Sequence, residues 1–513
     1  MRFKNKIKVQ VVDVRNVPWK DTLFFTSLQG IVNKKEPKLY LLFNDYDIKW
    51  LKYYKKFLSL SYEKIYKIDV LLNTFRNYLK GYVVWDPEIP DTANIATTLS
   101  GLNNWLIIHP EKEIFVEKFG LKKYEDLRGK FKGKSKTEIY KLTFEEFKDK
   151  LNKNAVACLE VPPANLINNF DYFPCQNHIR DLIISEKIFS FDLTSNPEYK
   201  EEFELKEEIF KSIKKLGLVL GWRTLRGSEA LHVKQASRNG LIVVCCLNSP
   251  NLSFHRHIRP NKILKLRTPI IKKKLENKIY ISFIISDGDA FHWDLSFQSK
   301  QWFSKNRGEI PLGWELQLLL LDYAPSIWNY YLETSTENDE ILAAASGIGY
   351  IFPTEMPEQF LSKYLSYTKK YMEKVNLRNL VILPGYKPLN ENIIKKYKKL
   401  CFKKSLLCLQ EGYGKWEGPG FVYKNLICLK TRLGGGNYKK EDLIEDLEKI
   451  SKCKKRPLFI TTHLVSITYD EVIKIMKNFT EFEIVPPSIL FRLAYKYFFQ
   501  KKKIIGKFKT GEE

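Results

Sequence analysis

Short apolar runs alternate with amphipathic stretches through the first half of the chain. The runs typical of strands span residues 8–14, 38–43, 81–86, 105–110, 187–193 and 240–247. The stretches with a helical period span residues 22–33, 47–58 and 198–217. Buried strands that alternate with amphipathic helices indicate an α/β layer architecture with a largely parallel sheet. We therefore predict an amino-terminal α/β region over residues 1–265, built as one region or as two subdomains.

The second half repeats the same two kinds of segment at a more regular spacing. Eight apolar runs predict strands at residues 278–286, 313–317, 341–346, 379–384, 405–410, 425–430, 457–462 and 482–486. This spacing predicts a carboxy-terminal (β/α)7–8 barrel-like domain over residues 279–500, and an open doubly wound sheet is the rival architecture. Residues 266–278 combine proline with charge and predict a linker, and residues 501–513 form a basic tail.

The composition is that of a compact globular protein. Of its 513 residues, 44% are hydrophobic and 14% are aromatic, which excludes a disordered chain. The eight cysteines include no Cys-x-x-Cys pair, so a zinc ribbon or a disulfide scaffold is not expected. No Gly-rich dinucleotide fingerprint follows a predicted strand, so we expect no Rossmann cofactor.

The net charge of +26 raises the question of a nucleic-acid partner. The excess is mostly Lys, spread along the chain and mixed with 59 acidic residues, and no zinc finger, RNP-like motif or basic heptad accompanies it. A Lys-rich surface, or attraction to an anionic sugar, explains the charge without nucleic acid. The amino terminus has no signal-peptide pattern, and the longest apolar run, residues 316–324, is far short of the roughly 18 residues of a membrane span. We expect a cytoplasmic protein.

Polar residues follow the predicted strands of the second half. Active sites of (β/α) barrels lie at the carboxyl ends of the strands, so these residues are the candidates for chemistry. The first strand is followed by Ser286-Asp287-Gly288-Asp289. On an extended chain, Asp287 and Asp289 would face the same way, with their Cα atoms about 6–7 Å apart. Gln317 ends the second strand and Glu315 lies two residues before it.

Later strands add further candidates at the same predicted rim. These are Glu355 after the third strand, Glu411, Tyr413 and Trp416 after the fifth, Arg432 after the sixth and His463 at the end of the seventh. Taken alone, Asp-Gly-Asp can be a turn that caps a helix, and a single His at a strand end can be structural. The gathering of carboxylates, aromatic rings, one His and one Arg at one rim is what indicates an active site.

The third strand ends in Ser-Gly-Ile-Gly-Tyr-Ile-Phe-Pro, residues 346–353. A phosphate-binding loop would need more glycines, a Lys and a helix directly after it, whereas Pro353 prolongs this loop. We interpret it as a rigid loop in which Gly347 and Gly349 let the backbone approach a ligand. Tyr350 would then shape a substrate subsite and Phe352 would lie behind it.

Residues 347–353 resemble the signature of the GxGYxYP family, whose members are described as glycoside hydrolases, with Phe352 where the family has Tyr. Residues 285–293 are similar to the family's Ser-Asp-Gly-Asp stretch, with Ala290 where Asn is usual. Residues 312–339 precede the signature much as in the family, and residues 25–41, 81–102 and 126–131 resemble its amino-terminal region. The resemblance covers residues 8–495 and implies an α/β region followed by a barrel-like catalytic domain.

The first functional hypothesis is glycoside hydrolysis, which needs two carboxyl groups and no cofactor. Asp287, Asp289 and Glu355 are the candidate catalytic acids, with Glu411 in reserve. The remaining rim residues would bind an oligo- or polysaccharide: Gly347, Gly349, Tyr350, Phe352, Tyr413, Trp416, Arg432 and His463.

Two alternatives remain open at this point. In the first, Asp287, Asp289 and His463 bind a divalent metal ion that activates water, as in a carbohydrate deacetylase. In the second, the protein binds carbohydrate without turning it over. The residues that differ from the family pattern, Ala290 and Phe352, motivate this second alternative.

Overall fold

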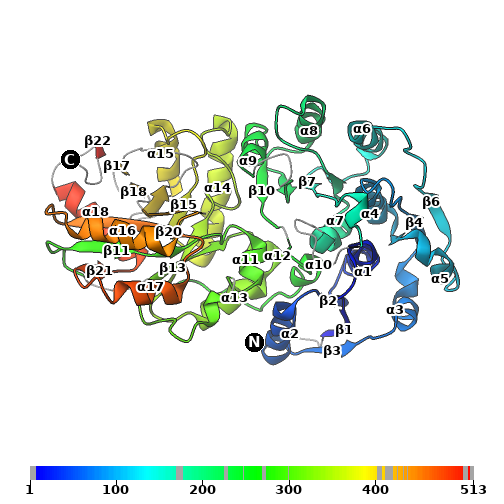
Figure 1. The fold of residues 1–513 in the computed structure, drawn as a ribbon, viewed down its shortest axis with the longest axis horizontal. Helices are drawn as coiled ribbons and strands as arrows, with labels where there is room; N and C mark the ends of the chain where they lie inside the picture. Colours follow the sequence, from blue (N-terminus) through cyan, green and yellow to red (C-terminus); the bar gives the residue numbers. More distant parts are fainter. Residues whose placement is uncertain are drawn as a thin grey trace. The chain divides into compact units, whose positions relative to one another are not determined.

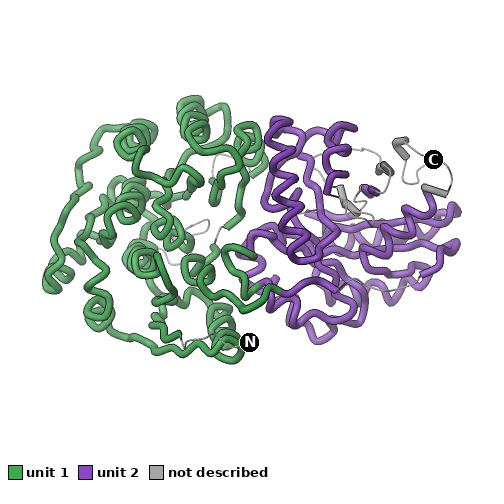
Figure 2. The backbone as a smooth tube through the Cα atoms, turned by 180° about the vertical axis from the view of Figure 1, so that it is seen from behind, with its two compact units in different colours: residues 1–263, 321–327 green, residues 264–320, 328–513 purple. Residues whose placement is uncertain are grey.

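The fold consists of two compact units, which Figure 2 shows in different colours. Unit 1 comprises residues 1–263 and 321–327, and unit 2 comprises residues 264–320 and 328–513. The computed structural model describes residues 7–168, 177–223, 229–246, 248–267, 273–298, 300–400, 407–410, 420–423, 426–430, 433–435, 437–500 and 506–508. Both units are built on parallel sheets with helices between the strands, which confirms the predicted α/β class.

In its described residues, unit 1 contains three separate parallel sheets. The first, in the order β2-β1-β3, is made of β1 (Ile7–Asp13), β2 (Leu39–Leu42) and β3 (Leu60–Lys64). The second, β5-β4-β6, is made of β4 (Gly81–Val84), β5 (Trp105–Ile108) and β6 (Lys123–Asp126). The third, β10-β9-β7-β8, is made of β7 (Ala155–Cys158), β8 (Phe189–Phe191), β9 (Leu218–Leu220) and β10 (Ile242–Val244).

Three helices form the common centre of unit 1. Each lies between the first two strands of its sheet along the chain: α1 (Trp19–Val32), α4 (Thr92–Asn103) and α7 (Arg180–Glu186). They pack on one another, and Figure 1 shows the three sheets around them. A Cβ atom on Gly30 would lie 2.7 Å from the Cβ of Ile184, and one on Gly101 would lie 3.1 Å from the Ile184 carbonyl oxygen. Both glycines therefore let their helices approach α7 more closely than a side chain would allow.

The other helices of unit 1 cover the outer faces of the sheets. They are α2 (Asp45–Leu58), α3 (Ile68–Phe75), α5 (Glu113–Glu117), α6 (Lys136–Phe147), α8 (Lys200–Ser212) and α9 (Glu229–Arg238). The short helix α10 (Leu252–His255) is instead buried and packs on α7. Near the end of residues 1–263, the chain returns to the first sheet. There the Asn251 side chain accepts from the Leu41 N–H at 2.9 Å and donates to the Leu41 carbonyl at 2.8 Å. This contact attaches α10 to the first sheet.

All eight strands predicted for the second half are present in unit 2, the first of them divided in two. They are β11 (Ile279–Ser282) with β12 (Ile284–Ile285), β13 (Leu312–Gln317), β14 (Asp339–Ala344), β15 (Asn379–Ile382), β16 (Leu407–Gln410), β18 (Leu426–Lys430), β20 (Leu458–Leu464) and β21 (Phe482–Ile484). Three further strands, β17 (Gly420–Tyr423), β19 (Leu433–Gly435) and β22 (Gly506–Phe508), join the same sheet.

The strand order is compatible with the predicted barrel. Parallel pairs run from β12 through β13, β14, β15 and β16 to β18. Strand β19, which follows β18 in the chain, pairs with β20, and β20 pairs with both β11 and β12. The helices of this half of the chain are α11 (Phe291–Leu295), α12 (Leu320–Tyr323), α13 (Pro325–Thr334), α14 (Glu358–Val375), α15 (Glu391–Tyr397), α16 (Lys440–Ser451), α17 (Tyr469–Met476) and α18 (Pro487–Gln500).

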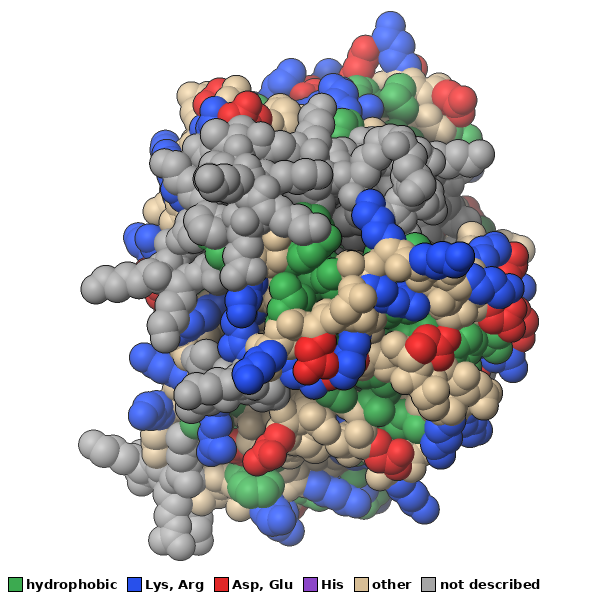
Figure 3. Space-filling model, turned by 90° about the vertical axis from the view of Figure 1, so that its left-hand side faces the viewer, with side chains coloured by type: hydrophobic (Ala, Val, Ile, Leu, Met, Phe, Trp, Pro, Cys, Tyr) green, Lys and Arg blue, Asp and Glu red, His purple; other side chains and the backbone are tan. Residues whose placement is uncertain are grey.

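The surface and the helices are relevant to two predictions: that nucleic acid is not the partner, and that no segment spans a membrane. On the face drawn in Figure 3, Lys and Arg side chains are scattered and Asp and Glu side chains lie among them. The basic charge is therefore spread over this face and does not form one continuous patch. In the described part of the chain, no helix combines the length and the apolar character needed to cross a membrane.

A buried carboxyl group stabilises the start of α2. Asp47 is 2% exposed and accepts hydrogen bonds from the backbone N–H groups of Phe43 and Asn44 at 2.7 and 3.0 Å. Burial raises the pKa of Asp47 to about 7, although these hydrogen bonds oppose the shift. In the unfolded chain the same group ionises near pH 4. Its contribution to stability is therefore present below about pH 4 and is lost as the pH rises through 7.

We predict that Asp47→Asn makes the stability of the protein less dependent on pH. Between pH 4 and 7, Asp47 of the wild-type protein is ionised in the unfolded chain but protonated in the folded protein. The free energy of unfolding therefore falls by at most about 1.4 kcal/mol per pH unit in this range. Asparagine keeps an oxygen for the two N–H groups but does not ionise, so this slope is lost. Urea unfolding followed by circular dichroism at half-unit pH steps measures it. Asp45→Asn, on the exposed side of the same helix turn, is the control, and equal slopes in all three proteins would contradict the prediction.

Candidate active site

The strand register of unit 2 brings three polar side chains together. Ile285 at the end of β12 pairs with Trp314 of β13 on one side and with Leu464 of β20 on the other. The next residue, Ser286, therefore lies beside Glu315 and close to His463, and its N–H donates to the Leu464 carbonyl at 2.9 Å. The cluster thus lies toward the carboxyl ends of three parallel strands.

These three side chains form the Ser286–Glu315–His463 cluster. The Ser286 hydroxyl is hydrogen-bonded to Nε2 of His463 and lies 3.3 Å from Oε2 of Glu315. The same His463 nitrogen lies 3.1 Å from Oε1 of Glu315. All three residues are buried. In a serine hydrolase the hydroxyl and the acid engage opposite nitrogens of the imidazole, whereas here both engage Nε2, so the geometry is not that of a catalytic triad.

Asp287, Gly288 and Asp289 form a tight turn after β12. Asp287 has a φ of 67°, in the left-handed region, and its carbonyl accepts a hydrogen bond from the Ala290 N–H at 2.9 Å. The expected extended spacing of Asp287 and Asp289 was therefore wrong, because the chain turns between them. Both are half-buried. A Cβ atom on Gly288 would lie 1.8 Å from the Glu315 carbonyl oxygen, so the turn rests directly on β13.

A second buried carboxyl group lies behind this turn. Gln317 connects the two, since its side-chain amide donates to the Asp289 carbonyl at 3.0 Å and its backbone N–H donates to Oδ2 of Asp294 at 3.3 Å. Burial raises the pKa of Asp294 well above its usual value, and the negative charges of Asp289 and Glu315 add to the rise. Asp289 and Glu315 therefore both lie within electrostatic reach of Asp294.

The glycine-containing loop after β14 is held by its own neighbours. The Ser346 hydroxyl donates to the Ile351 carbonyl at 3.0 Å and accepts from the Leu383 N–H at 3.1 Å. The Tyr364 hydroxyl of α14 donates to the Gly349 carbonyl at 2.7 Å. Gly347 has a φ of 151°, and a Cβ atom there would lie 2.5 Å from the Thr368 hydroxyl of α14. The close approach that Gly347 permits in this structure is therefore to α14.

The other predicted site residues lie as follows. Tyr350 and Phe352 are 1% and 0% exposed and pack edge to face, so contact of either ring with a sugar stays a prediction. The Glu355 side chain is 5% exposed, and its Oε1 lies 4.0 Å from Nζ of Lys387. Four candidates lie outside the described residues: Glu411, Tyr413, Trp416 and Arg432.

Sequence reasoning assigned no role to three members of this site: Ser286, Glu315 and Asp294. Glu315 was noted at the rim, and its place two residues before Gln317 on one strand put both on the same face. Ser286 opens the Ser-Asp-Gly-Asp stretch and was not singled out. Asp294 falls in a short helix, where an acidic residue gives no functional signal.

The alternative hypothesis places a metal ion at Asp287, Asp289 and His463, and it can be compared with this geometry. Nε2 of His463 is engaged by Ser286 and Glu315. Over the described ranges, no group of three or more His, Cys, Asp and Glu side chains is arranged to hold a metal ion.

The geometry so far defines an α/β protein with parallel sheets, whose polar cluster lies at the carboxyl ends of the strands. The chain belongs to the GxGYxYP family. Its family models match over four segments: a first domain at residues 8–77, a second at 79–151, a third at 170–257, and the "GxGYxYP putative glycoside hydrolase C-terminal domain" at 277–495. The first two segments correspond to the first two sheets of unit 1, and β7 lies ahead of the third segment.

A solved structure shares this fold. The chain is similar to the crystal structure of a "putative hydrolase" from Bacteroides thetaiotaomicron VPI-5482, with a TM-score of 0.83. The match covers 97% of this chain and 96% of the other at 22% sequence identity, so it supports the fold alone. A search of curated proteins found no match.

We predict that Gly288→Ala destabilises unit 2 by about 3 kcal/mol, because the added methyl group meets the backbone of Glu315 and β13 cannot retreat. Gly129→Ala is the control. It has a φ of +68° with open space around it, so it carries only the cost of backbone strain, about 1 kcal/mol. Urea unfolding of both variants checks the prediction. It fails if Gly288→Ala is no less stable than Gly129→Ala.

Proposed function

We propose that the protein is a glycoside hydrolase whose reacting carboxyl groups are Asp287 and Asp289. The observation that carries this proposal is the turn itself. It holds two half-buried acids beside a buried cluster, at the carboxyl ends of parallel strands. The description of the family supports the same class of reaction. The substrate would be an oligo- or polysaccharide, and a net charge of +26 favours an anionic one.

The reaction places specific demands on the two acids. One carboxyl group must give a proton to the glycosidic oxygen, while the other attacks the anomeric carbon or activates water. Asp287 and Asp289 are accessible enough to touch a substrate, whereas Glu315 and Asp294 are buried. Glu355, just after the glycine-containing loop, is a third candidate, although its side chain is only 5% exposed.

The buried cluster would act as a positioning device. Glu315 accepts from Ser286 and His463, which fixes its side chain, and its carbonyl oxygen is covered by Gly288. Movement of Glu315 would therefore move the turn that carries both aspartates. Around this centre, Gly347, Gly349, Tyr350, Phe352 and His463 are proposed to shape the substrate rim. Outside the described residues, we also assign Glu411, Tyr413, Trp416 and Arg432 to this rim.

A series of amide variants tests the assignment against a panel of nitrophenyl glycosides. We expect Asp287→Asn and Asp289→Asn each to lower kcat/KM by about 10²–10⁴-fold, because each removes a proton-transfer or nucleophilic group. Glu315→Gln should lower it by a smaller factor, since it acts through the turn. Glu355→Gln shows whether the third acid reacts. The matched control is Glu445→Gln, whose side chain is 65% exposed on α16.

Two outcomes would contradict the assignment. Full activity in both Asp287→Asn and Asp289→Asn would remove these residues from the reaction. Binding of a glycan by the wild-type protein, with no hydrolysis of that glycan or of the panel, would favour the non-catalytic alternative.

We further propose that hydrolysis needs no metal ion. Because His463 is engaged by Glu315 and Ser286, it is poorly placed to serve as a ligand together with Asp287 and Asp289. We expect the hydrolysis rate to be unchanged after dialysis against EDTA and after addition of Zn²⁺ or Mn²⁺. Acetyl-sugar hydrolysis that EDTA abolishes and metal restores would instead favour the deacetylase.

A further inference from the structure

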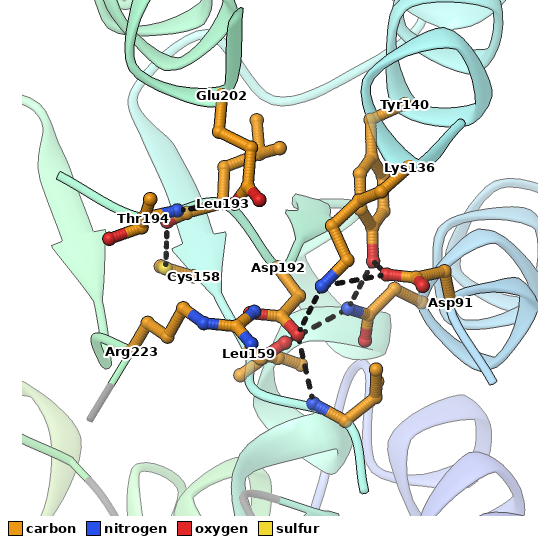
Figure 4. A network of polar contacts seen from close by, with 12 residues as sticks. Asp91, Lys136, Tyr140, Cys158, Leu159, Asp192, Leu193, Thr194, Glu202 and Arg223 are labelled. Atoms are coloured by element: carbon orange, nitrogen blue, oxygen red, sulfur yellow. Dashed lines mark hydrogen bonds and ion pairs between the residues drawn. The ribbon is translucent and has the colours of Figure 1, made fainter. Parts of the chain in front are cut away.

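A network of charged side chains lies at the carboxyl edge of the third sheet of unit 1, far along the chain from the candidate active site. Its members are Asp91, Lys136, Tyr140, Asp192 and Arg223, named here the Asp192 network. Figure 4 shows these side chains pointing toward one another from different elements. Asp192 directly follows β8, Arg223 lies three residues after β9, and Lys136 is the first residue of α6.

Asp192 is the centre of the network. It is fully buried, and its carboxylate forms an ion pair with Arg223 and another with Lys136, whose Nζ lies 3.0 Å from Oδ2. The Val161 N–H, from the segment after β7, lies 3.4 Å from the same oxygen. Burial opposes ionisation, but the two cations outweigh it and hold the pKa of Asp192 below its usual value.

Asp91 forms the more exposed side of the network. The Tyr140 hydroxyl donates to Oδ1 of Asp91 at 2.6 Å, and Nζ of Lys136 lies 3.6 Å from the same atom. The side chains of Asp91 and Lys136 are 14% and 21% exposed, so solvent reaches this end. A ligand would therefore meet Asp91 and Lys136 first.

The position of the network in the fold points to a ligand. The strand order β10-β9-β7-β8 places β8 on one side of β7 and β9 on the other. From β7 the chain therefore first adds a strand on one side of the sheet, β8, and then crosses over to add β9 on the other side. In open parallel sheets, ligands bind outside the carboxyl ends of the strands at such a reversal. Val161, Asp192 and Arg223 lie at this edge.

Buried polar groups near this edge have hydrogen-bonding capacity that folding has not used. Ser195, three residues after Asp192, is 4% exposed, and His232 is 1% exposed. Among the described residues, neither the Ser195 hydroxyl nor Nε2 of His232 has a hydrogen-bond partner. The other His232 nitrogen lies 3.0 Å from Nζ of the fully buried Lys206, which also donates to the Leu193 carbonyl at 2.9 Å.

Stability alone does not explain such a network. Buried ion pairs contribute little net stability, because the loss of hydration offsets their attraction, and apolar residues of similar volume are often as good. Two strands of the third sheet, β8 and β9, and helix α6 bring charged groups to one edge. Such an arrangement therefore calls for a role in recognition.

We propose that the Asp192 network binds a neutral saccharide, at a site separate from the catalytic turn of unit 2. Lys136 and Arg223 already neutralise Asp192. Within the described members of the network, an added anion would therefore meet the negative charges of Asp192 and Asp91 and two cations that are already paired. A sugar hydroxyl both donates and accepts. Vicinal hydroxyls can therefore donate to Asp91 and accept from Lys136 at the same time.

Calorimetric titration of the full-length protein tests this proposal. The probes are glucose, galactose, mannose, N-acetylglucosamine and maltose, with inorganic phosphate as the competing chemistry. We expect at least one sugar to bind, and both Lys136→Met and Asp91→Asn to weaken it about tenfold or more, since each removes a charged hydrogen-bonding group. The control is Lys130→Met, a lysine of the same unit that is 45% exposed and pairs with Glu125.

The variant Asp287→Asn/Asp289→Asn separates the two sites, because it alters unit 2 and should keep the sugar affinity of the network. Four results would overturn the proposal. The first is that the wild-type protein binds no sugar at 10 mM, and the second is that binding is lost in the unit 2 variant but not in Lys136→Met. The third is that phosphate binds in a Lys136-dependent way while no sugar binds. The fourth is that the sugar affinity is unchanged in both Asp91→Asn and Lys136→Met. Thermal melts of every variant show whether lost binding reflects lost folding.

Discussion

The contact between Gly288 and the backbone of Glu315 is the constraint on which the candidate active site depends. It fixes the Asp287–Asp289 turn on β13, and the pairing of Ile285 with Trp314 and Leu464 fixes β13 relative to β12 and β20. Because the backbone contact leaves no space for a side chain, the turn cannot shift along the strand. The buried bonds of Glu315 to Ser286 and His463 then fix the side chain at the same point. Register, close packing and buried hydrogen bonds thus act on the same few residues.

Much of this fold can be predicted from the sequence, because strands buried on both faces appear as short apolar runs between helices. All eight strands predicted for the second half are present. The sequence does not show which strands pair, so the three separate sheets of unit 1 were not foreseen. Helix α18 (Pro487–Gln500) was also not predicted, since its apolar residues follow a proline pair that resembles a loop.

The candidate site could be predicted only in part. Asp287 and Asp289 were found because polar residues after a buried strand are conspicuous. The contact of Glu315 with His463 joins residues 148 positions apart and depends on tertiary pairing that periodicity does not encode. Aromatic residues are ambiguous for another reason: Tyr350 and Phe352 suit a sugar-binding rim and a packed core equally well, and the structure buries both. The turn at Asp287 depends on a positive φ, which is uncommon for residues other than Gly, although Asp adopts it more often than most.

The shared centre of α1, α4 and α7 has a consequence for how unit 1 folds. Helix α1 buries residues on every side, from Trp19 to Val32, and a helix apolar all round needs neighbours on all its faces. Gly30 and Gly101 both lie against α7, which belongs to the third sheet. We therefore expect the three sequence domains of the amino-terminal half to fold as one cooperative unit. A fragment limited to the first sheet would expose α1 and would be prone to aggregate, and amide hydrogens of the three helices should exchange with similar protection.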